Sequence, residues 1–82
     1  MRSATRFRYE IEADADTDAL VRITNQLNFA NTAPWALMLA TTGECLTVDV
    51  ELRDITETLA DYIRRKLLQQ TCVIAVRVYV LA

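Results

Sequence analysis

Three carboxylates at alternate positions, Asp14, Asp16 and Asp18, are the first residues of this chain whose spacing could carry chemistry. Carboxylate oxygens suit Ca²⁺, but a calcium loop of the EF-hand type also needs a glycine at its sixth position and a distal Glu. Those two positions hold Ala19 and Asn25. Acidic residues just before a helix are also stabilised by the helix dipole and by water. We therefore expect no metal site here.

Catalysis would need a nucleophile with a base, a pair of carboxylates or a metal centre. The chain contains no His, which is the commonest general base and a common metal ligand, and Lys66 is its single lysine. No set of acid and base groups converges in the sequence. We expect no catalytic residues, no cofactor and no enzymatic activity.

The two cysteines, Cys45 and Cys72, form no CxxC pair, and a secreted domain of this size usually has more disulfides. We interpret both as small buried hydrophobic residues in a reducing, cytoplasmic protein. The segment 1–8 becomes charged before any apolar run, so we expect no signal peptide. The longest apolar stretch, Pro34–Ala40, is too short to span a bilayer, and we expect no membrane partner.

The composition predicts one globular domain spanning residues 1–82. Apolar residues make up 52% of the 82 residues and charged residues 24%. Nine Lys and Arg against eleven Asp and Glu give a net charge of -2, which argues against a nucleic-acid partner. The single glycine excludes a glycine-rich phosphate loop.

Hydrophobic periodicity along the chain predicts six helices and strands. Apolar and charged residues alternate in 7–13, and an apolar stripe with helical spacing follows up to Ala30. The run 35–40 is apolar at every position, which is typical of a strand covered on both faces. A turn over 41–44 leads into the alternating segment 46–52, so the two strands form a hairpin.

A second helix is expected to begin with an acidic cap at Asp54 and to bury a stripe that includes Leu59, Ile63 and Leu67. The basic run 64–66 near its end complements the helix dipole, although such a run could also bind phosphate or a membrane. The segment 73–81 is the last strand. The order strand-helix-strand-strand-helix-strand predicts an α+β, ferredoxin-like sandwich: a four-stranded antiparallel sheet in the order 4-1-3-2 with two helices on one face.

The segments 16–27 and 31–39 resemble the opening of an ACT-like domain: an acidic turn, a helix with a Leu-x-x-Ile stripe and a second strand. The resemblance is nearest to the short, single-domain small (regulatory) subunit of acetolactate synthase. It implies a regulatory or assembly domain that joins its sheet to another copy edge to edge and modulates a larger enzyme of amino-acid metabolism.

By this resemblance an amino-acid effector would bind near Asp16, Thr17, Asp18 and Asn31. Effector-binding members have a glycine where Asp18 stands, so that the backbone can approach the ligand. Positions that supply polar ligand contacts fall near Ala15 and Ala33, whose side chains cannot form hydrogen bonds. We therefore expect a degenerate effector site.

In the expected sheet the second and fourth strands form the edges, and both are apolar on two faces. Uncovered edges of this kind promote aggregation, so we expect a homodimer or larger even oligomer. The expected interface consists of Trp35, Leu37, Met38 and Leu39, and the fourth strand is a second candidate. Of Leu37→Lys and Met38→Lys, one should then unfold the domain and the other release monomers. The alternative is a small-molecule-binding domain whose pocket lies between protomers.

Overall fold

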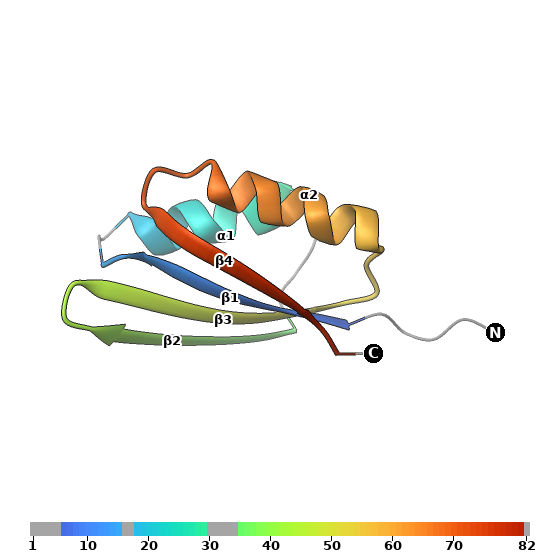
Figure 1. The fold of residues 1–82 in the computed structure, drawn as a ribbon, viewed down its shortest axis with the longest axis horizontal. Coiled ribbons are helices and arrows are strands. Elements are labelled where there is room, and N and C mark those ends of the chain that lie inside the picture. Colours follow the sequence, from blue (N-terminus) through green and yellow to red (C-terminus); the bar gives the residue numbers. More distant parts are fainter. Residues whose placement is uncertain (1–5, 16–17, 30–34, 82) are drawn as a thin grey trace.

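A computed structural model describes residues 6–15, 18–29 and 35–81, which form one sheet and one helical layer (Figure 1). The four strands are antiparallel in the order β2-β3-β1-β4, and both helices lie on the same face. The ferredoxin-like fold expected from the sequence is confirmed. Its elements are β1 (Arg6–Asp14), α1 (Ala19–Phe29), β2 (Ala36–Thr42), β3 (Cys45–Arg53), α2 (Glu57–Leu68) and β4 (Val73–Val80).

The core lies between the helices and the two central strands. Strands β1 and β3 pair in register from Arg6↔Arg53 to Asp14↔Cys45, so their apolar residues share the face that meets the helices. The helices contribute the apolar stripes that the spacing predicted. The buried residues of these four elements are Phe7, Tyr9, Ile11, Ala13, Ala19, Ile23, Leu27, Leu46, Val48, Val50, Leu52, Ala60, Ile63 and Leu67.

Helix α2 begins differently from the sequence expectation. Its N-cap is Thr56, whose hydroxyl oxygen accepts a hydrogen bond from the backbone N–H of Leu59 at 3.1 Å. Asp54, the expected cap, instead has a positive φ of 60° and turns the chain from β3 toward the helix. A short polar side chain tolerates this left-handed conformation better than a branched one does.

The hairpin between β2 and β3 is tighter than expected. Thr42 pairs with Cys45, which leaves two residues in the turn instead of four. Gly43 adopts a φ of 61°, a conformation that glycine reaches without steric cost. Both cysteines are free, as expected, with Cys72 buried and Cys45 half-buried.

Tyr9 carries a polar group into the core. Its ring is completely buried, and its hydroxyl donates a 2.7 Å hydrogen bond to the backbone carbonyl of Ala60 in α2. Burial raises the pKa of the Tyr9 hydroxyl, the charge of Asp61 raises it further, and Arg64 opposes the rise. The bond ties the sheet to α2 at the centre of the molecule.

Tyr9→Phe is expected to lower the free energy of unfolding by about 1 kcal/mol at pH 7, because the buried carbonyl loses its donor. Since the folded-state pKa is raised, the contribution of Tyr9 is complete below the unfolded pKa of about 10 and declines at higher pH, by up to about 1.4 kcal/mol per unit. Urea titrations at pH 7, 9 and 11 measure both effects. A difference between the two proteins that stays constant from pH 9 to 11 would contradict this.

Candidate interaction surface

The edge strand β2 is exposed along its whole length and on both faces. Leu37 and Leu39 each keep 44% of their surface accessible, and Met38 keeps 69%. Figure 1 shows β2 at the sheet edge farthest from the helices, and no described residue of β2 belongs to the buried core. The expectation that this apolar run is covered on both faces is therefore wrong.

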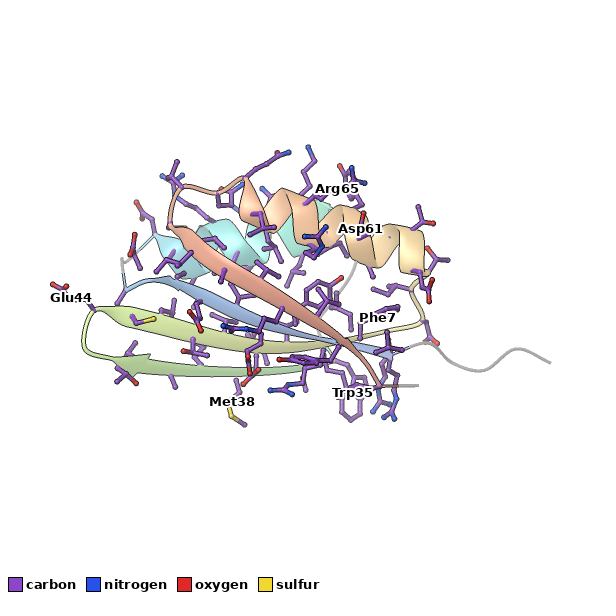
Figure 2. All side chains as sticks on the ribbon, in the orientation of Figure 1. Phe7, Trp35, Met38, Glu44, Asp61 and Arg65 are labelled. Carbon is purple, nitrogen blue, oxygen red and sulfur yellow. The ribbon has the colours of Figure 1, made fainter. Side chains whose placement is uncertain are left out.

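The two faces of β2 are assigned by its pairing with β3. Leu37 and Leu39 lie opposite Val50 and Val48, which are buried beneath the helices, so both leucines are on the helix side of the sheet. Met38 is on the open side, where Figure 2 shows its side chain pointing away from the helical layer. Apolar side chains thus project on both sides of an edge strand that pairs with β3 alone among the described strands.

The opposite edge, β4, is protected. Arg77 forms ion pairs with Glu10 at 3.3 Å and with Glu12 at 3.0 Å, which places a charge in the middle of the strand. The register between β1 and β4 also shifts at Glu12/Ala13. Charges and bulges are two devices by which natural sheets prevent edge-to-edge pairing. Among the strands described, β2 is the edge that has neither.

The register shift between β1 and β4 also explains why the residues of β4 that face the helices do not alternate strictly. Val76 and Val78 face the helices and pack against the core, and Val73 does the same, although it is an odd number of positions away. The extra residue of the bulge, Ile74, is 59% exposed. The bulge therefore lets one more valine, Val73, pack against the core.

The open face of the sheet carries charges that neutralise one another. Arg8 pairs with Glu10 at 3.1 Å and with Asp49 on β3 at 3.3 Å, and its guanidinium lies 5.2 Å from the ring centre of Tyr79. Acidic and basic side chains on adjacent strands therefore pair across this face. The half-buried polar residues of the two central strands on this face are Arg6, Arg8, Glu10, Glu12, Thr47, Asp49, Glu51 and Arg53.

Trp35, just before β2, is held in place by β3. Its backbone N–H donates to the carbonyl of Glu51 at 2.8 Å, and the guanidinium of Arg53 stacks 3.4 Å from its ring centre. Arg53 is fixed in turn by a 2.9 Å hydrogen bond from its Nε to Glu51. The indole nevertheless remains 60% exposed, on the open side shown in Figure 2. The sequence predicted an interface role for Trp35 but not this stack, which joins the residue before β2 to the last residue of β3.

A shallow hollow of about 170 Å³ lies on the open face beside β2. Ligand pockets for small molecules are usually about 300–1,000 Å³, so this hollow could hold no more than part of a ligand. Its floor and rim are formed by Arg8, Ala36, Leu37, Met38, Asp49, Val50 and Glu51.

The expected effector site lies mostly outside the described residues, which do not include Asp16, Thr17 or Asn31. Asp18 is described: it is exposed, and its backbone carbonyl accepts the N–H of Arg22 at 3.0 Å in the first turn of α1. Within 6–15, 18–29 and 35–81, no three His, Cys, Asp or Glu side chains are grouped to hold a metal ion.

The basic run on α2 makes contacts within its own helix. Arg64 and Arg65 form ion pairs with Asp61 at 2.9 and 3.1 Å, and Lys66 lies 5.5 Å from the ring centre of Tyr62. The hydrogen bond from Arg64 holds the pKa of Asp61 below its usual range. These contacts favour the helix-stabilising interpretation over a phosphate site. No helix in the described part of the chain is long and apolar enough to cross a membrane.

Comparison with known proteins agrees with this architecture. The structure superposes on the ACT domain of GTP pyrophosphokinase from Chlorobium tepidum with a TM-score of 0.83 and 13% identity, covering 94% of this chain and 100% of that domain. An uncharacterised protein from Thermotoga maritima gives a TM-score of 0.79 at 14% identity, with 98% and 100% covered. A homoserine dehydrogenase from Thiobacillus denitrificans gives 0.76 at 15%, with 95% of this chain and 17% of the enzyme covered.

These identities are low, so the three structures support the fold and nothing finer. No curated protein matches the sequence. The model of the ACT-like domain family, however, matches residues 2–82, nearly the whole chain. The protein therefore belongs to the ACT-like domain family.

Proposed function

We propose that this chain is a non-catalytic regulatory or assembly domain that associates with itself through β2 and modulates a larger cytoplasmic enzyme of amino-acid metabolism. The small subunit of acetolactate synthase, which the sequence resembles, is the kind of subunit we have in mind. The observation that carries the proposal is the apolar, uncharged β2 edge, which is exposed on both faces.

An unprotected edge exposes backbone groups that readily pair with another strand. In this protein β4 has Arg77 and a bulge, whereas β2 has no charge from Ala36 to Thr42. Because β4 carries these obstacles to pairing and β2 does not, β2 is the edge that is available to pair with another strand. Self-association covers it without requiring a second protein, and two-fold dimers are the commonest closed assemblies.

Light scattering coupled to size exclusion tests this at protein concentrations between 1 and 100 μM. We expect a dimer or larger even oligomer that dissociates toward the lower end of the range. A homogeneous monomer at tens of micromolar would end the proposal that the domain associates with itself.

A second candidate is a small-molecule-binding domain with its pocket between protomers. The hollow beside Met38 is too small to enclose a ligand alone, but a second chain at β2 would add a wall to it. Its polar groups, Arg8, Asp49 and Glu51, could then orient an amino-acid-like ligand.

Thermal denaturation with each of the twenty amino acids separates the two candidates. We expect no stabilisation by valine, leucine or isoleucine, because Asp18 stands where effector-binding members have a glycine. A ligand at a hundredfold excess over its Kd would add about 2.7 kcal/mol, a shift that is easily measured for a domain of this size. Saturable stabilisation by any amino acid would favour the second candidate, and Asp18→Gly should then strengthen the binding.

A further inference from the structure

A second hollow lies in the helical layer, which covers the side of the sheet opposite the open face (Figure 1). We call it the inter-helix hollow, and its volume is about 190 Å³. It is lined by Gln26 of α1, by Tyr62 and Lys66 of α2, and by Gln69 and Gln70 just after α2. A volume of this size has room for about six waters, or for a small organic ion in their place.

The side chains that line the inter-helix hollow supply hydrogen-bond donors and no carboxylate. Three of them are carboxamides, each with two N–H donors, and the others are a phenol and an ammonium group. Within the described ranges, none of the three carboxamides forms a side-chain hydrogen bond with another residue. The hollow therefore presents donors that the described protein does not use, grouped around one positive charge.

Lys66 carries that positive charge, and no carboxylate in the described part of the chain pairs with it. The preceding residues Arg64 and Arg65 both pair with Asp61, at 2.9 and 3.1 Å. The ammonium group of Lys66 instead lies 5.5 Å from the ring centre of Tyr62, and the residue is half-buried. A partly buried charge without a counter-ion is unfavourable, so a bound anion would stabilise this part of the molecule.

We propose that the inter-helix hollow binds a small organic monocarboxylate. Its carboxylate oxygens accept hydrogen bonds from the ammonium group of Lys66 and from the carboxamide of Gln26, and its short apolar chain lies against the ring of Tyr62. The site is formed by the two helices, so it is separate from the β2 edge and from the hollow beside Met38. It goes beyond the proposed function, because it assigns a ligand to the domain that does not depend on self-association.

The charge of the inter-helix hollow selects among anions. Lys66 supplies a single positive charge in the last turn of α2, where the end of the helix is partly negative. A second negative charge finds no partner there, which disfavours phosphate and dicarboxylates. Phosphate sites more often use helix N-termini or arginine pairs. An α-amino acid is also disfavoured, because its ammonium group would lie close to that of Lys66.

The experiment is an NMR titration of the ¹⁵N-labelled full chain with sodium butyrate, at constant ionic strength. Butyrate has about six non-hydrogen atoms, and a ligand of that size can reach a Kd of about 1 mM. We expect saturable shifts that are largest at Gln26, Tyr62, Lys66 and Gln70. Sodium phosphate, sodium succinate and valine, titrated in the same way, should each bind at least tenfold more weakly than butyrate.

Two variants and a matched control test the residues that we assign. Lys66→Gln removes the charge and should weaken butyrate binding at least tenfold, and Gln26→Leu removes the donor on α1 and should weaken it about threefold. Arg65→Gln is the control, because Arg65 is exposed and does not line the hollow, and it should leave the Kd within about twofold. Melting temperatures without ligand, expected within a few degrees of the unmodified protein, confirm that each variant is folded.

A protein side chain could supply the same carboxylate, and a blocked tripeptide with a central glutamate separates this source from a free organic acid. The peptide should bind at least tenfold more weakly than butyrate, because the hollow has no room for the backbone that carries the group. Tighter binding of the peptide than of butyrate would identify the hollow as a contact for a partner protein and overturn the small-molecule assignment.

Three other outcomes would also overturn the inference. They are no saturable shift at about fifty times the expected Kd, binding of phosphate as tight as that of butyrate, and equal weakening by Lys66→Gln and Arg65→Gln. Shifts centred on β2 would instead place the ligand in the hollow beside Met38, which contradicts this site and favours the second candidate function. Self-association is measured separately by light scattering, so failure of the ligand site leaves that proposal standing.

Discussion

Leu37→Lys and Met38→Lys are both expected to give folded monomers. The sequence led us to expect that one of these residues would face the helices and that its replacement would unfold the domain. The structure corrects this, because Leu37 is 44% exposed and Met38 is 69% exposed. A lysine at either position therefore stays hydrated in the monomer and costs little stability.

In a dimer formed through β2 the same lysines would be desolvated, and each would lie near the lysine of the second copy. Juxtaposed like charges cost several kcal/mol, and each 1.4 kcal/mol is tenfold in affinity, so the dimer should weaken by at least about 100-fold. Light scattering gives the oligomeric state, and circular dichroism confirms the fold.

Val21→Lys is the matched control, because Val21 is 56% exposed but lies on α1, away from β2. It should leave the association constant within about twofold of the unmodified protein, as expected of a surface substitution. If Leu37→Lys or Met38→Lys remained as associated as this control, β2 would not be the interface. If either variant unfolded, the assignment of β2 as an uncovered strand would be wrong.

Ile63→Ala is expected to lower the free energy of unfolding by about 2–5 kcal/mol, the largest stability effect that we predict. Ile63 is 1% exposed at the centre of the stripe by which α2 packs on the sheet. Its truncation removes buried apolar surface and leaves a cavity that close-packed neighbours fill incompletely. Small domains are marginally stable, so the variant should approach unfolding at 37 °C.

Leu68→Ala, on the same helix, is the control for this prediction. Leu68 is 42% exposed, and its truncation should cost less than about 1 kcal/mol. Urea titration of both variants gives the two differences. Similar losses in the two proteins would contradict the assignment of Ile63 to the core and of Leu68 to the surface.

The candidate surface was predictable from the sequence only in part. An apolar run without charge or proline singled out 35–40, and the expected strand order placed it at an edge. The stack of Arg53 on Trp35 could not be predicted, because it depends on how two strands end relative to each other. The protection of β4 combines Arg77, which is visible in the sequence, with Glu10 and Glu12 of a strand more than sixty residues away.

The sequence by itself determined the elements and their order. Alternation in β1 and β3 and the helical stripes around Ile23 and Ile63 are local patterns. Each pattern was sufficient to predict its element, because one face of that element must be buried. The start of α2 was also predicted closely: the sequence led us to expect its cap at Asp54, and the structure has the cap nearby at Thr56.

The tertiary structure alone decided what covers each face. The run around Met38 predicts a buried strand, because six apolar residues in succession usually occur where both faces are covered. Periodicity cannot show how far the helical layer extends across the sheet, and that extent decides whether an edge strand is covered. The bulge opposite Glu12 similarly moves Val73 to the helix side by shifting a register that alternation assumes to be constant. Coverage depends on where separate elements pack against each other, and that is settled by contacts between residues distant in the chain.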